Sequence, residues 1–267
     1  MDQNVQSIIE KWYRLLRFPP KYDAEFYGAL EEICIPVDSS IETYDVREQD
    51  GKKNFLSYLY FCEKLEQRYA QQGIDNAILM DTLHDLVLWT DTWSGLKGQL
   101  YLGELAWLKH HLSMKLFKLG RLQFAPGGAE MDVPRLGISK GDPMMEIHVP
   151  AVGPLDPAAV QDSVERAKAF FAKYYPEYAY RYFTCHSWLL DTSLKELLGD
   201  DSNIIRFQNL FDVVHEDPSD AALRYVFQWN TTKENVGEME CTSSFAKKVK
   251  ERAMAGRDFY VSYGIIL

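Results

Sequence analysis

Two short stretches of the sequence hold side chains that can move a proton near neutral pH. The stretch PMMEIHVP (143–150) contains Glu146 and His148, and the stretch AYRYFTCHSWLL (179–190) contains His186. An imidazole changes its charge close to pH 7, and a carboxylate accepts a proton or orients a neighbouring imidazole. One carboxylate and two imidazoles would therefore suit general-base catalysis if the fold brings them together.

Both stretches are predicted to be β-strands, whose side chains alternate between two faces. Glu146 and His148 then share one face of the first strand. On the second strand, three further side chains lie on the same face as His186: Tyr182, Thr184 and Trp188. One predicted helix separates the strands, and a right-handed crossover would leave them parallel and adjacent. Glu146, His148 and His186 would then be cross-strand neighbours, with Trp188 as a wall of the site.

A structural interpretation competes with the catalytic one. Buried glutamates and histidines in sheets often serve only as hydrogen-bonded structural residues, because buried polar groups need partners whatever their purpose. Cys185 is expected to be a small hydrophobic residue. It points to the opposite face from His186, so a cysteine hydrolase that uses this pair is disfavoured. Asp191, at the start of DTSLKELL, is expected to cap a short helix.

Residues 1–114 are predicted to form a helical domain. Apolar side chains recur at helical spacing in the segments 2–18, 23–34, 53–73, 75–95 and 101–117. Capping or helix-breaking residues bound these segments: Asp2, Pro19, Pro20, Pro36, Gly73 and Gly95. His110 and His111 are adjacent in the last segment and would diverge by about 100°. They are therefore expected at the surface or between domains rather than on one metal ion.

Residues 115–267 are predicted to form an α/β (α+β) domain with a mixed sheet packed against the helical domain. Strands are expected at 118–125, 143–150, 179–190, 202–217, 223–229 and 257–267. The first of these is expected to break at Pro126-Gly127-Gly128. Helices are expected at 156–176, 192–199 and 243–256, with Asp156 capping the first. Strands that alternate with helices are typical of an α/β sandwich.

The composition argues against several classes of partner and location. The formal net charge of −10 repels phosphate backbones and anionic lipid headgroups, so neither nucleic acid nor a membrane is an expected partner. The cysteines are scattered and form no metal or disulfide pattern: Cys34, Cys62, Cys185 and Cys241. Reduced thiols, and no recognisable secretory leader or long apolar run, favour a cytoplasmic location. No pattern favours a particular oligomeric state.

Four stretches, in this order along the chain, resemble a family of bacterial proteins described as acyltransferases. They are LGRLQF (119–124), GDPMMEIHVPAVGPLDP (141–157), YFTCHSWLLD (182–191) and DSNIIRFQ (201–208). Proteins of this family join a helical N-acyltransferase N-terminal domain to a GNAT-like C-terminal domain. The resemblance implies that two strands of the sheet splay to admit the pantetheine arm of an acyl-CoA or acetyl-CoA.

The resemblance also implies roles for individual residues. Glu146 matches the position of a base for the amine, with His148 as its rival and His186 as a residue that orients the base or the acceptor. The strand N–H groups from Ile147 to Val149 would polarise the thioester carbonyl. AVGPLDP (151–157) replaces the usual R/Q-x-x-G-x-G/A loop for the pyrophosphate, with Gly153 as its one glycine.

The sequence is compatible with two functions, one enzymatic and one non-catalytic. The first is acyl transfer from acyl-CoA to an amine of a small molecule or peptide, with Glu146 or His148 accepting the proton. The second is a non-catalytic GNAT-like protein that binds a ligand or partner, which the missing glycine signature favours.

Overall fold

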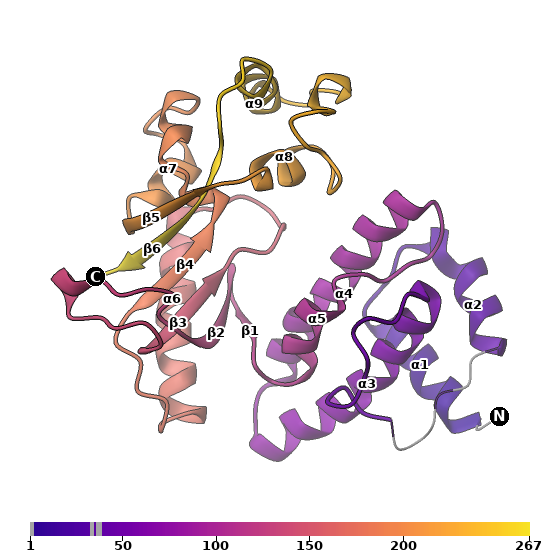
Figure 1. Ribbon diagram of the computed structural model, residues 1–267. Coiled ribbons are helices and arrows are strands. Elements are labelled where there is room, and N and C mark those ends of the chain that lie inside the picture. Colours follow the sequence, from indigo (N-terminus) through magenta and orange to yellow (C-terminus); the bar gives the residue numbers. More distant parts are fainter. Residues whose placement is uncertain (1–2, 33–34, 36–38) are drawn as a thin grey trace. The chain divides into compact units, whose positions relative to one another are not determined.

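The computed structural model describes residues 3–32, 35 and 39–267 (Figure 1). The chain divides into two compact units, residues 1–119 and 120–267. Three features assigned from the sequence lie outside the described residues: the cap at Asp2, the thiol of Cys34 and the helix end at Pro36.

Residues 1–119 contain the predicted helices. They are α1 (Gln3–Leu15), α2 (Asp23–Glu32), α3 (Gly51–Gln72), α4 (Asn76–Lys97) and α5 (Leu105–Leu112), with a 3-10 turn η1 (Pro20–Tyr22). Asp50 and Asp75 cap α3 and α4, since their carboxylates accept hydrogen bonds from N–H groups of the first turn. The prediction that α4 ends at Gly95 is wrong. The helix ends at Gly98, whose φ of 66° gives the left-handed conformation that closes a helix.

The expected surface or interdomain position of His111 is also wrong. Its side chain is fully buried within the helical unit, and Nε2 lies 2.9 Å from Oδ2 of Asp85. Nδ1 lies 3.2 Å from the carbonyl oxygen of Trp107, one helical turn earlier. The buried ring is accommodated because both of its nitrogens have polar partners.

The sheet has the strand order β1-β2-β3-β4-β6-β5 (Figure 1). Its strands are β1 (Phe117–Leu119), β2 (Leu122–Gly128), β3 (Pro143–His148), β4 (Phe183–Ser187), β5 (Asp212–Pro218) and β6 (Tyr260–Ile266). β3 and β4 are parallel, whereas β2–β3, β4–β6 and β5–β6 are antiparallel. The predicted mixed sheet and the predicted parallel neighbours are therefore confirmed.

The helices of residues 120–267 are partly those predicted. They are α6 (Pro157–Tyr174), α7 (Asn203–Gln208), α8 (Ala221–Val226) and α9 (Ser244–Met254), with 3-10 turns η2 (Pro134–Leu136), η3 (Trp188–Leu190), η4 (Thr192–Glu196) and η5 (Val236–Glu238). The strand predicted over 202–217 is wrong in its first half, although its second half forms β5, and the strand predicted over 223–229 is wrong. Residues 203–208 form α7, because Ser202 caps them with a hydrogen bond from the N–H of Ile204, and the segment 223–229 begins within α8.

Two other local predictions need correction. The expected break at Pro126-Gly127-Gly128 does not occur, since β2 pairs with β3 through Gly128. β4 is shorter than predicted and gives way after Ser187 to the 3-10 turns η3 and η4. The predicted cap at Asp191 is confirmed, because its carboxylate accepts a hydrogen bond of 2.8 Å from the N–H of Ser193.

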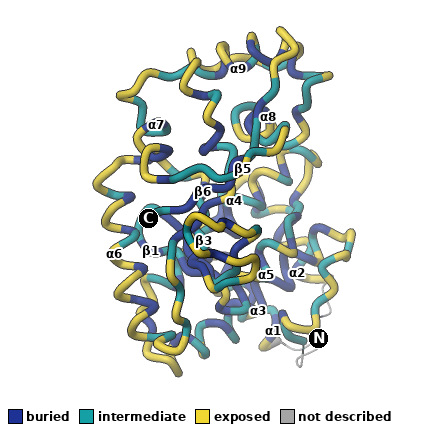
Figure 2. Tube along the Cα trace, turned by 60° about the vertical axis from the view of Figure 1, so that its left-hand side comes forward, coloured by how far each residue is buried: buried dark blue, intermediate teal, exposed yellow. Residues whose placement is uncertain are grey.

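The two faces of the sheet are covered by different elements. On one face, Met144, Tyr263 and Ile265 pack against Val133 and other residues between β2 and β3. Ile266 alternates to the opposite face, where it lines a pocket with α6 and α7. Figure 2 shows that the buried residues follow the strands, while much of α6 is exposed.

The loop between β3 and α6 (149–156) is held by Arg121, which directly precedes β2. The guanidinium donates to the carbonyl oxygens of Pro150 at 3.1 Å, Gly153 at 2.9 Å and Pro154 at 2.9 Å. Gly153 has a φ of 60°, the left-handed conformation that glycine adopts without strain. Three carbonyls on one guanidinium fix the turn that leads from β3 into α6.

Replacing Arg121 with alanine should loosen this loop without unfolding the protein. The three carbonyls lose a charged donor, and we expect the free energy of unfolding to fall by about 1–3 kcal/mol. Backbone amides of residues 151–153 and 155 should exchange faster with solvent, as measured by hydrogen exchange. Arg166→Ala is the matched control, because the Arg166 guanidinium donates to the side chain of Asp162 on α6 rather than to the loop. Equal exchange in the loop of both variants would contradict the role of Arg121.

Candidate functional site

The seam between β3 and β4 closes at one end and opens at the other. The pairing joins Met145 to Phe183 and Glu146 to Thr184, and the register ends there. β3 nevertheless stays paired with β2 up to His148, and β4 stays paired with β6 up to Ser187. The open seam (Ile147–His148 facing Cys185–Ser187) is therefore a parting of two intact strands.

Backbone groups of β3 point toward this seam. The N–H of Met145 donates to the carbonyl oxygen of Tyr182 across it at 3.0 Å. N–H groups two residues apart point to the same side of a strand, so that of Ile147 also points toward β4, where the parallel pairing of Glu146 with Thr184 directs it to the carbonyl oxygen of Thr184. Val149 follows directly after β3, beyond the last paired residues. Gly153 lies farther along, in the loop that Arg121 holds. The three residues assigned to a cofactor from the sequence thus follow one path from the seam to α6.

Glu146 and His148 form one pair on β3. Nε2 of His148 lies 3.5 Å from Oε2 of Glu146, and the two side chains are 30% and 37% exposed. The Glu146 carboxylate occupies the space above Gly127 on β2, where an added β-carbon would overlap Oε1 of Glu146. Gly127 therefore allows the carboxylate to lie close to the backbone of β2.

His186 has a different carboxylate partner, Glu130, which lies just after β2. Nδ1 of His186 is 3.0 Å from Oε1 and 2.9 Å from Oε2 of Glu130. This contact assigns the proton of the neutral ring to Nδ1 and leaves the lone pair of Nε2 to accept a proton. The side chains are 36% and 43% exposed, so solutes reach the pair.

Tyr263 lies beside His186, on the neighbouring strand β6. The two residues are register partners, and their rings meet edge to face with centroids 6.0 Å apart. The Tyr263 hydroxyl is buried, and the backbone of Glu130 and the side chain of Thr184 lie near it. Burial raises its pKa, and the charges of Glu130 and Glu146 raise it further. One buried hydroxyl is thus within electrostatic reach of both carboxylates.

Cys185 and Trp188 both pack in apolar surroundings, at different places along the chain. Cys185 is 2% exposed, and burial raises the pKa of its thiol to about 12, so the nucleophilic thiolate is scarce at neutral pH. Its expected role as a small hydrophobic residue agrees with this position. Trp188 stacks on Tyr225 with ring centroids 6.0 Å apart, at the start of the turn η3. It packs against the apolar cluster of α8 and α9.

Sequence reasoning did not assign Glu130, Tyr263 or Arg121 to the candidate site. Glu130 follows GGA at the end of β2, and only the strand pairing brings it to His186, 56 positions later. Arg121 stands inside one of the stretches singled out from the sequence, LGRLQF. An unexplained cation inside such a stretch was the available signal.

Two further kinds of site are absent from the described residues. No group of three or more histidine, cysteine, aspartate or glutamate side chains there is arranged to hold a metal ion. None of the helices described is both long and apolar enough to cross a membrane.

Comparison with known protein families gives two matches along the chain. A model described as an N-acyltransferase N-terminal domain matches residues 1–114, and one described as a GNAT-like C-terminal domain matches residues 116–266. No curated protein matches the chain.

Several solved structures are similar to the chain. An acyltransferase in complex with decanoyl-CoA and teicoplanin is 28% identical with a TM-score of 0.70, over 79% of this chain and 64% of its own. An acyltransferase in complex with decanoyl-CoA is 25% identical with a TM-score of 0.70, over 99% and 78%. One in complex with CoA and 10C-teicoplanin is 24% identical with a TM-score of 0.77, over 96% and 86%, which shows the fold.

This chain spans less than two thirds of the first of these structures. The GNAT-like family model, by contrast, covers more than half of this chain, and the N-terminal model covers most of the remainder. The chain therefore belongs to the family that joins an N-acyltransferase N-terminal domain to a GNAT-like C-terminal domain.

Proposed function

We propose that the protein is an acyl-CoA-dependent N-acyltransferase that acts on an amine of a small molecule or peptide. The end of the β3–β4 pairing at Glu146 and Thr184 is the observation that supports this proposal, because backbone groups beyond it can take an extended ligand between the strands. Membership of the family and the acyl-CoA ligands of similar acyltransferases support the same donor.

The thioester of the donor suits the seam beside Ile147. Its neighbour across the seam, Cys185, is buried and apolar, so that part of the seam has a low dielectric constant. The N–H of Ile147 serves the last paired residues of the two strands, so we assign the polarising group to the N–H of Val149, which comes next on the same side of the chain. A backbone N–H directed at the thioester carbonyl stabilises the negative charge that develops on the oxygen during attack.

His186 is the better placed base of the two histidines. Its ring is oriented by a contact of 2.9–3.0 Å with Glu130, whereas the 3.5 Å between His148 and Glu146 is too long for a good hydrogen bond. A base held by a carboxylate on its other nitrogen is the arrangement that activates nucleophiles in many enzymes. We assign Glu146 and His148 to binding the incoming amine at the mouth of the seam.

The reaction balances with these groups. The neutral amine attacks the thioester carbon and forms the C–N bond. Its proton passes to Nε2 of His186, and the positive ring is stabilised by Glu130. The C–S bond then breaks, and the CoA sulfur leaves with the proton held by His186. The products are an amide and free CoA.

The acceptor class is inferred from charge and from the similar structures. The chain has a formal net charge of −10, which favours an amine over an acidic acceptor. Two similar acyltransferases are in complex with teicoplanin or 10C-teicoplanin. We therefore place the acceptor among amine-bearing small molecules and peptides.

A second candidate is a GNAT-like protein that binds a ligand without catalysis. The observation that favours it is the start of α6. There the carboxylate of Asp156 accepts hydrogen bonds from the N–H groups of Ala158 and Ala159, and Pro157 has no N–H group. The amide cradle that usually holds a pyrophosphate at this position is thus filled by the protein itself.

Calorimetry and a thiol-release assay separate the two candidates. We expect acyl-CoA donors of increasing chain length, from acetyl to decanoyl, to bind, and at least one to release CoA when mixed with a panel of amines. Binding without release for every amine would favour the non-catalytic candidate. No binding of any donor would remove the proposed function.

Replacing His186 should remove most of the acyl transfer while leaving donor binding intact. Loss of a general base lowers kcat about 10²- to 10⁴-fold, and we expect His186→Gln to fall in this range. Glu130→Gln should lower kcat about 10- to 100-fold, because a hydrogen bond to a charged group is lost. His215→Gln is the control, since His215 lies 3.0 Å from its own carboxylate, Asp217, on β5. Equal kcat values for His186→Gln and His215→Gln would contradict the assignment.

Gly127→Ala tests the place of the Glu146 carboxylate. The added β-carbon would overlap Oε1 of Glu146 and force that side chain to move. We expect this variant and Glu146→Gln to raise the KM for the amine by similar factors, about tenfold. The double variant should be no worse than either single one, because both remove the same interaction. Fully additive effects on KM would show that Gly127 acts through another group.

A further inference from the structure

The hydroxyl of Tyr178, in the segment between α6 and β4, contacts the backbones of β2 and β3 at the same place. It accepts a hydrogen bond of 3.0 Å from the N–H of Gly127. Its oxygen also lies 2.5 Å from the carbonyl oxygen of Gly127 and 2.7 Å from that of Met144, the register partner of Gly127. A tyrosine hydroxyl has one proton to donate, so the two carbonyls share it. One side chain thus joins two paired residues of neighbouring strands.

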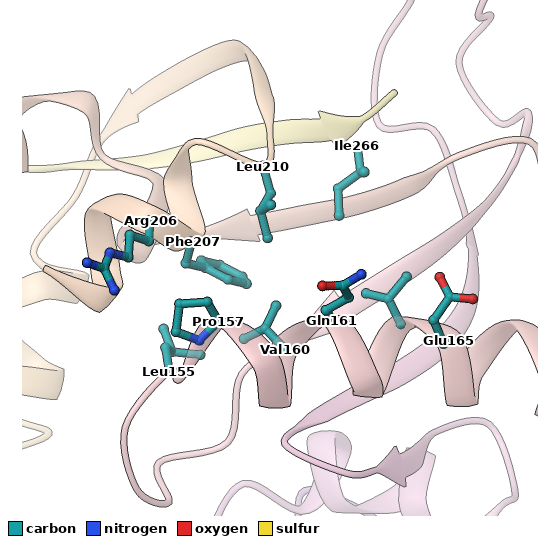
Figure 3. Close-up of a pocket in the computed structure, with 10 residues that line it drawn as sticks. Leu155, Pro157, Val160, Gln161, Glu165, Arg206, Phe207, Leu210 and Ile266 are labelled. Atoms are coloured by element: carbon teal, nitrogen blue, oxygen red, sulfur yellow. The ribbon is translucent and has the colours of Figure 1, made fainter. Parts of the chain in front are cut away.

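The ring of Tyr178 belongs to an aromatic cluster on the face of the sheet that α6 covers. It stacks on Tyr180 with ring centroids 6.2 Å apart, and Tyr180 meets the ring of Phe183 edge to face at 5.2 Å. Phe183 is the register partner of Ile266, which lines the pocket beside α6 (Figure 3). Cross-strand partners point to the same face of a sheet. The Tyr178 ring therefore lies on the face opposite the Glu146 carboxylate.

Gly127 is the residue that the Tyr178 hydroxyl and the Glu146 carboxylate have in common. A β-carbon added to Gly127 would lie only 1.9 Å from Oε1 of Glu146, so the carboxylate rests against this stretch of β2. Burial raises the pKa of the Tyr178 hydroxyl, and the charge of Glu146 raises it further, so the hydroxyl keeps its proton near neutral pH. The position of the Gly127 backbone sets how closely the carboxylate can approach the strand.

We propose that Tyr178 is a positioning residue for the acceptor: its hydroxyl fixes Gly127 and thereby holds the Glu146 carboxylate where it binds the incoming amine. This inference rests on the proposed function, in which Glu146 binds the amine, and it adds a residue that itself touches neither substrate. The hydrogen bonds of the Tyr178 hydroxyl go to backbone groups of β2 and β3, so its effect on the amine passes through those strands. A shift of about 1 Å in a group that positions a substrate can cost about 100-fold in rate.

The test compares Tyr178→Phe with the wild type in steady-state acyl transfer. Phenylalanine keeps the ring and removes the hydroxyl, so the N–H of Gly127 loses its partner. We expect the KM for the amine to rise about 3- to 10-fold, because the carboxylate is held less well. The kcat at saturating amine and the Kd for acyl-CoA, measured by calorimetry, should stay within about twofold of the wild type. In a Glu146→Gln background the same substitution should leave the KM unchanged, since the carboxylate that Tyr178 positions is already gone.

Tyr180→Phe is the matched control, because it removes a hydroxyl from the ring stacked on Tyr178 and leaves the contacts with Gly127 in place. We expect its KM for the amine to equal that of the wild type. An unchanged KM in Tyr178→Phe would overturn the proposal. So would an equal rise in the wild-type and Glu146→Gln backgrounds, because a general loosening of the sheet acts in both. A Tyr178→Phe variant that does not fold, or that loses kcat and donor binding together, would show a structural role and also overturn it. A wild type that transfers no acyl group from any donor would instead overturn the proposed function.

Discussion

The partial pairing of β3 and β4 is the constraint on which the site depends. Backbone N–H and C=O groups must find hydrogen-bond partners, and a strand normally finds them in its neighbours. β3 and β4 keep their outer neighbours to the end but lose each other after Glu146 and Thr184. The groups along the open seam are left for water or for an extended ligand. The amide-bearing arm of an acyl-CoA has the shape and the hydrogen-bonding groups to take that place.

The seam also separates two environments that serve different parts of a reaction. One face carries the half-exposed pairs Glu146–His148 and His186–Glu130, which suit proton transfer and binding of an amine. The opposite face carries α6, α7 and an apolar pocket with Arg206 at one end. A donor that enters from the pocket face and presents its thioester through the seam would meet the acceptor on the other side. The sheet then keeps the two substrates apart until their reacting atoms meet.

The sequence predicted the strands that carry the candidate site residues because strand alternation and one crossover helix are local patterns. They placed Glu146, His148 and His186 on parallel neighbours of a mixed sheet, and the register confirms that arrangement. They could not predict Glu130, because its contact with His186 depends on how far β2 runs past Gly127 and on the turn that follows. The strand predicted over 202–217 failed in its first half for a related reason, since the cap at Ser202 outweighed the β-branched side chains that follow it.

A crystal structure of the protein with a non-hydrolysable thioether analogue of octanoyl-CoA would show directly what occupies the seam. We expect the sulfur atom to lie between Ile147 and Cys185, with the amides of the pantetheine arm hydrogen-bonded to β3. The strands would remain parted beyond Glu146 and Thr184. A seam closed by continuous pairing of β3 with β4, or filled by side chains while the analogue binds elsewhere, would contradict this placement and remove the basis for the proposed catalysis.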